Sequence, residues 1–164
     1  TSISPATASS RMPLRAAAAV LAAALVLSAC GHPAMMALSL LPQGTFSTLL
    51  KNMQTVDEPN RKRLAELEQK GDWQGLADFA QANLAKDAQN AEWWLMRGYA
   101  FIRMEQFPRA AESFQEAVRF EPNEMLGWHL LAETYRLMKQ PERAVRTLDA
   151  ALRVSQDSPT AWYL

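Results

Sequence analysis

The sequence has few of the side chains on which most catalytic and metal sites depend. Its 164 residues include one cysteine and two histidines, and its six glycines are scattered along the chain. Neither a glycine-rich phosphate loop nor a zinc motif such as H-E-x-x-H is present. We therefore expect no cofactor, no metal site and no enzymatic activity from these residues.

An excess of charge of one sign is also missing. Lys and Arg together number 17, as do Asp and Glu, so the formal net charge is zero. Proteins that bind nucleic acids concentrate basic side chains on one surface. Because this sequence has no basic block, we do not expect a nucleic-acid partner.

Long hydrophobic runs are absent as well. The longest run, residues 16–27, has twelve apolar residues, whereas a membrane-spanning helix needs ~20. Arg11 and Arg15 precede this run, and the small residues Ser28 and Ala29 follow it. A positive flank, a short apolar core and a small-residue cleavage site in this order are typical of a secretory signal peptide. We assign residues 1–29 to a leader and signal peptide.

Cys30, the only cysteine, comes directly after the small residues. The sequence Leu27-Ser28-Ala29-Cys30-Gly31 resembles a bacterial lipobox, which implies that Cys30 carries palmitate and other acyl chains. The alternative is an ordinary cleaved signal followed by a free thiol. No Asp follows Cys30, and by resemblance to the sorting rule of enterobacterial lipoproteins this implies the periplasmic face of the outer membrane. Residues 30–56 are then a lipidated tether, with a short helix expected over residues 45–53.

Beyond the tether, a pattern of large and small residues recurs at a fixed interval. The first copy consists of Trp94, Gly98, Phe101, Ala110, Phe114 and Ala117. The second copy consists of Trp128, Ala132, Tyr135, Ala144, Leu148 and Ala151. Spacings of three and four residues place each half of the pattern on one face of a helix. Each period therefore predicts a pair of helices.

This pattern resembles the tetratricopeptide repeat, a helix–turn–helix unit of about 34 residues. The resemblance implies an all-α solenoid of antiparallel helix pairs, with six to eight helices and no strands. Residues 57–90 form a degenerate first repeat, and residues 91–124 and 125–158 form two full repeats. Residues 159–164, which include Trp162, begin a further truncated repeat, so we expect the chain to be a piece of a longer protein.

The same resemblance assigns roles within each repeat. Gly98 and Ala132 let the paired helices approach closely, and Trp94 and Trp128 fill the space between those helices. The first helix of each pair lines a concave groove. The residues that point into it are Leu95, Tyr99, Ile102, Arg103, His129, Glu133, Arg136 and Leu137. These eight residues are called the groove face below.

The groove face contains aromatic, aliphatic and charged residues, without the lysines and asparagines with which some family members hold a carboxylate. We expect Tyr99, Arg103, His129 and Arg136 to form one exposed strip that contributes little to folding. Glu133 and Arg136 are three residues apart, so they can instead simply pair in solvent.

The resemblance implies that this chain is a lipid-anchored, periplasmic adaptor that binds a protein or peptide. Such a scaffold would assemble or regulate an envelope complex of pilus or secretion, outer-membrane assembly or cell-wall machinery. The alternative is the non-catalytic repeat region of a larger envelope enzyme whose active domain lies beyond residue 164. A groove for glycans is a third alternative, but it would need clustered exposed aromatic residues.

Overall fold

The computed structural model of the chain describes residue 41 and residues 44–157. These residues belong to one structural unit, Ala37–Leu164. The predicted signal peptide, Cys30 and the start of a further repeat at residues 159–164 lie outside the described residues. Within the described part, no helix is long and apolar enough to cross a membrane.

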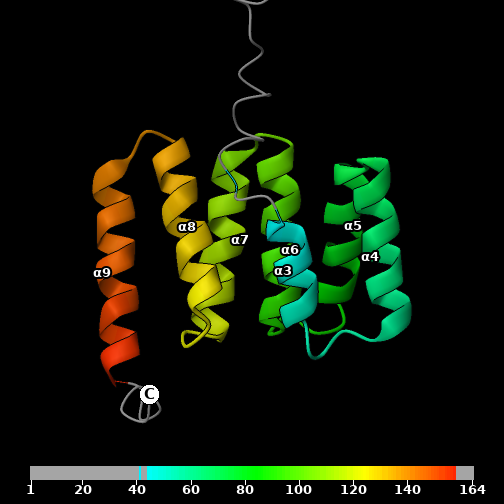
Figure 1. Ribbon diagram of the computed structural model, residues 1–164, viewed down its shortest axis with the longest axis horizontal. Coiled ribbons are helices and arrows are strands. Elements are labelled where there is room, and N and C mark those ends of the chain that lie inside the picture. Colours follow the sequence, from blue (N-terminus) through cyan, green and yellow to red (C-terminus); the bar gives the residue numbers. More distant parts are fainter. Residues whose placement is uncertain (1–40, 42–43, 158–164) are drawn as a thin grey trace, which may run out of the picture. The chain divides into compact units, whose positions relative to one another are not determined.

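Seven helices and no strands make up the described residues (Figure 1), which confirms the predicted all-α class. They are α3 (Thr45–Asn52), α4 (Glu58–Lys70), α5 (Trp73–Leu84), α6 (Ala91–Arg103), α7 (Phe107–Phe120), α8 (Met125–Leu137) and α9 (Pro141–Asp157). From α4 onward, each helix packs against the next helix in the chain. The helices therefore stack as the pairs α4/α5, α6/α7 and α8/α9, in the order that the sequence period predicts.

The turn inside each pair has one backbone geometry, repeated at the same interval. Gly71, Glu105 and Lys139 have positive φ angles of 66°, 58° and 57°. In each turn, the next amide donates to the carbonyl five residues earlier, at 2.9 Å. These bonds join Asp72 to Leu67, Gln106 to Phe101, and Gln140 to Tyr135. This is the Schellman arrangement that ends a helix, and it is kept even where the turn residue is not glycine.

The pair α6/α7 is closely packed at Gly98. A Cβ atom added there would lie 2.5 Å from Cε1 of Phe114, and Phe114 is fully buried. The hydrogen side chain of Gly98 is therefore what allows the phenyl ring to sit against α6. This contact confirms the predicted close approach of the two helices.

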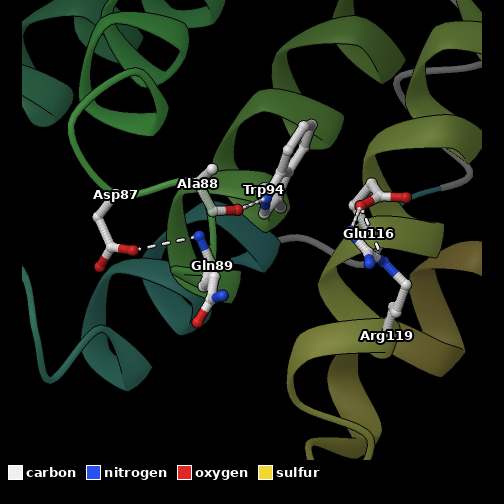
Figure 2. A network of polar contacts seen from close by, with 6 residues as sticks. All are labelled: Asp87, Ala88, Gln89, Trp94, Glu116 and Arg119. Atoms are coloured by element: carbon white, nitrogen blue, oxygen red, sulfur yellow. Dashed lines mark hydrogen bonds and ion pairs between the residues drawn. The ribbon is translucent and has the colours of Figure 1, made fainter.

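Trp94 and Trp128 have a role that their spacing did not predict. Both are half-buried, and their indole Nε1 atoms donate to the carbonyls of Ala88 and Pro122, each at 2.8 Å. Figure 2 shows the Trp94 indole directed toward Ala88 in the turn before α6. The two tryptophans thus tie the linker before each full repeat to the first helix of that repeat.

Candidate functional site

The α6 half of the groove face is covered by α3. Leu95, Tyr99 and Ile102 are only 6 %, 4 % and 3 % exposed, and Arg103 is half-buried. The ring centroids of Phe46 and Tyr99 lie 5.5 Å apart. Tyr99, which we expected to contribute to an exposed strip, is therefore enclosed, because α3, a helix assigned to the tether, packs on α6 (Figure 1).

Tyr99 belongs to a cluster that joins α5 to α6. Its ring meets that of Trp73 edge to face, with centroids 6.3 Å apart, and its hydroxyl accepts a hydrogen bond from Arg103 Nη1 at 2.7 Å. The Arg103 guanidinium carbon lies 3.8 Å from the centroid of the Trp73 ring, which is cation–π geometry. Burial raises the pKa of Tyr99, and the charge of nearby Arg103 opposes that shift. This arrangement makes Tyr99 a packing residue, contrary to the expectation that it contributes little to folding.

The link between α3 and α4 is fixed by polar contacts from α6. The Glu92 carboxylate accepts hydrogen bonds from the amides of Gln54 and Thr55 and from the Thr55 hydroxyl. Asn90 Nδ2 donates to Thr55 Oγ1 at 2.8 Å. The sequence indicates Glu92 only as an acidic residue in a first helical turn, so its contact with so distant a segment of the chain could not be predicted.

Arg61 of α4 fixes the same segment from the other side. Its Nε donates to the carbonyl of Val56 at 2.9 Å, and its Nη1 donates to the carbonyl of Leu50 at 3.0 Å. The Leu50 carbonyl belongs to the last turn of α3, so Arg61 satisfies one of the acceptors that a helix end leaves open.

The α8 half of the groove face is open. His129 and Arg136 are exposed, whereas Glu133 and Leu137 are half-buried. Arg136 Nε donates to Glu133 Oε2 at 2.8 Å, so these residues do pair with each other near solvent. This bond is the main reason that the pKa of Arg136 is raised. Each of the four positions lies one full repeat after its counterpart on α6, so both halves belong to the same side of the helix stack.

The comparisons with known proteins agree with this architecture. Residues 128–161 match the tetratricopeptide repeat family. Most of these residues form α8 and α9, and the fold of the described residues is that of a tetratricopeptide-repeat solenoid. No curated protein matches the sequence of this chain.

Two solved structures share this fold. One is MamA from Desulfovibrio magneticus RS-1, from residue 41 to its end, with 21 % identity and a TM-score of 0.55. That match covers 69 % of this chain and 65 % of the MamA chain. A double mutant of RS-1 MamA gives 20 % identity and a TM-score of 0.54, with 68 % of this chain and 64 % of that chain covered. This chain thus spans a little under two thirds of the MamA chains, and the likeness concerns the fold.

A pocket lies between the C-terminal end of α3 and the start of α8. Leu49, Leu95 and Leu126 line it together with the carboxylates of Glu92, Glu121, and Glu124. Burial raises the pKa of Glu121, and the negative charges of Glu92 and Glu124 raise it further. The pocket, which includes Leu95 of the groove face, therefore combines an apolar base with an acidic rim.

The described residues contain no group of three or more His, Cys, Asp or Glu side chains placed to hold a metal ion. The repeats support a role in protein interaction, for which the groove face and its adjoining pocket are the candidate surface.

Proposed function

We propose that this tetratricopeptide-repeat protein is a lipid-anchored adaptor of the bacterial cell envelope that binds a protein partner on its groove face. The supporting observation is the open α8 half, where His129 and Arg136 are exposed and Leu137 is half-buried. Protein interfaces commonly combine an apolar centre with a polar rim, and arginine is enriched in them. This surface has that composition, which favours a protein or peptide ligand.

The location of the adaptor is proposed from the sequence around Cys30. Cleavage before Cys30 and acylation of its thiol would attach the protein to the periplasmic face of the outer membrane. One acyl chain alone gives only marginal membrane binding, but a bacterial lipoprotein carries three by resemblance, so the attachment would be stable. The groove face would then meet partners in the periplasm, such as components of pilus, secretion, outer-membrane or cell-wall assemblies.

Crosslinking from the groove face tests the binding function. A photoreactive amino acid placed at His129 in the membrane-attached protein should crosslink to a defined envelope protein. His129→Ala with Arg136→Ala should reduce capture of that protein at least tenfold, with an unchanged helical circular-dichroism spectrum. The matched control is Arg119→Ala with Arg146→Ala, which removes exposed charges from the second helices α7 and α9. Capture that is lost in the control and retained in the groove-face variant would contradict the proposal.

The anchor has a separate test. Cys30→Ser should abolish labelling by a palmitate analogue and move the protein out of the membrane fraction. Labelling that persists after this substitution would contradict lipidation at Cys30, whatever the groove face binds.

A further inference from the structure

We infer that the α6 half of the groove face is a binding site for an amphipathic helix, and that α3 is its built-in, displaceable occupant. This inference rests on the proposed adaptor function and specifies the partner's chemistry. The partner would present an apolar stripe like that of α3 and take the place of α3 on α6. The α8 half would hold the part of the partner that extends beyond α3.

The shape of the site follows from which residues of α3 are buried against the rest of the protein. Its apolar residues Phe46, Leu49 and Leu50, with Met53 directly after the helix, are spaced as one helical stripe. Leu49 and Met53 are each only 2 % exposed, and Phe46 and Leu50 pack partly buried against the same core. The residues between them, such as Thr48 and Lys51, are exposed. The site therefore contacts one face of a helix, which is the helix-in-groove mode of peptide recognition.

Two properties of α3 make it replaceable. It has 8 residues, whereas isolated helices shorter than ~12–15 residues are marginal in water. Its N-cap, Gly44, provides no side-chain hydrogen bond, so contacts with α6 are needed to keep α3 helical. If α3 leaves, it loses its helical structure, and the surfaces of Tyr99 and Leu95 that it covers become available to another helix.

The segment that follows α3 is held more firmly and can act as a hinge. The amide and hydroxyl of Thr55 are bonded to Glu92, and the Val56 carbonyl accepts from Arg61. These contacts do not involve the apolar side chains of α3, and the one further bond from Arg61 to α3, at the Leu50 carbonyl, must break when α3 leaves. The chain can therefore remain attached at residues 54–56 while residues 45–52 detach.

The orientation of α3 indicates further features of the partner. Phe46 near its start contacts Tyr99, and Leu49 and Met53 line the pocket beside Glu92 at the start of α6. The helix thus runs antiparallel to α6, and its C-terminal end points to the rim formed by Glu92, Glu121 and Glu124. Glu92 stays bonded to residues 54 and 55, so a partner helix in this orientation should carry Lys or Arg after its apolar stripe to complement Glu121, Glu124 and the helix dipole.

A peptide titration decides the inference without any partner protein. The probe is a fluorescent synthetic peptide with the sequence of residues 41–56, and the control peptide carries Phe46→Ala and Leu49→Ala. Each is titrated by fluorescence anisotropy into the full chain, into the same chain with Leu49→Asp, which unseats α3, and into the chain with Thr48→Asp. Thr48→Asp places the same charge on the exposed face of α3 and is the matched control.

The native peptide should bind the Leu49→Asp chain at least tenfold more tightly than the wild-type and Thr48→Asp chains, and the control peptide should bind none of them. Equal affinity for all three chains would overturn the inference. So would absence of binding to a Leu49→Asp chain that keeps its helical spectrum. A dimeric wild-type chain in sedimentation, with α3 exchanged between copies, would also overturn it.

Hydrogen exchange on the wild-type chain keeps the inference testable if Leu49→Asp does not fold. The amides of α3 should exchange through local opening while those of α6 stay protected. Exchange of α3 only together with α6 would overturn the inference. Failure of the adaptor function is distinct: it would appear as no crosslinked protein at residue 129, even though the peptide binds the opened chain.

Discussion

The helices α6 and α8 occupy equivalent positions in consecutive repeats but have opposite environments. Tyr99 is buried under α3, and its counterpart Glu133 lies in the open half and pairs with exposed Arg136. Leu95 and Ile102 on α6 likewise correspond to His129 and Arg136 on α8, one repeat later. The position of a residue within the repeat therefore decides on which side of the stack it lies. Residues on that side are apolar where another segment covers them, as on α6, and more polar where none does, as on α8.

The largest expected effect comes from truncating the two members of the Tyr99/Glu133 pair. Tyr99→Ala removes a buried ring that contacts Phe46 and Trp73, and we expect it to lower the free energy of unfolding by ~3 kcal/mol. Glu133→Ala should change it by less than ~0.5 kcal/mol, as is usual for surface substitutions. Urea denaturation followed by circular dichroism measures both. Similar losses from the two variants would show that the α6 and α8 faces do not differ in burial.

The second prediction compares the helix contacts of the two repeats. Gly98→Ala places a Cβ atom 2.5 Å from the buried Phe114 ring and should cost ~1–3 kcal/mol of unfolding free energy. The equivalent pair in the next repeat is Ala132 and Leu148, and Leu148 is 40 % exposed.

Copying that pair into the first full repeat, as Gly98→Ala with Phe114→Leu, should recover part of the loss, because the smaller side chain leaves room for the Cβ. Urea denaturation of the single and double variants gives the coupling between the two positions. A double variant whose loss equals the sum of the two single losses would contradict direct contact between residues 98 and 114.

The repeated turn provides a third comparison, with a smaller effect. Gly71 adopts positive φ at low cost, and Gly71→Ala should destabilise the chain by ~1 kcal/mol. Lys139 adopts the same conformation with a side chain, so Lys139→Gly should raise the free energy of unfolding by up to ~1 kcal/mol. Thermal melting tests both predictions: the melting temperature should fall for Gly71→Ala and rise for Lys139→Gly. Destabilisation by Lys139→Gly would mean that its side chain makes a contact that outweighs the backbone strain.

The smallest expected effect concerns pH and the acidic rim. Burial and two neighbouring carboxylates raise the pKa of Glu121 in the folded protein, so the folded state binds its proton more strongly than the unfolded state does. Folding stability should therefore fall as pH rises from the unfolded pKa of Glu121 through the folded one. Glu121→Gln should flatten this part of the pH profile, as measured by urea midpoints across that range. An unchanged profile would show that Glu121 does not contribute to it.

Much of the repeat region was predictable because its signals are local. The period of the sequence pattern predicted the helix pairs, and the resemblance to the tetratricopeptide repeat predicted that Gly98 lets the paired helices approach closely. The apolar stripe from Phe46 to Met53 also predicted a helix where α3 is found. Its location was not predictable, because a short apolar stripe fits many apolar surfaces, and Phe46 and Tyr99 lie far apart in the chain.

The sequence by itself determined the all-α class, the order of the helix pairs and which residues share one face of a helix. Periodicity encodes these features because helical geometry fixes which residues share a face. Only the tertiary structure decided that α3 covers α6 and leaves α8 open. That choice depends on burying the stripe of α3 against Leu95 and Tyr99 and on bonding the backbone at Thr55 to Glu92. Both are long-range contacts that no local pattern in the sequence specifies.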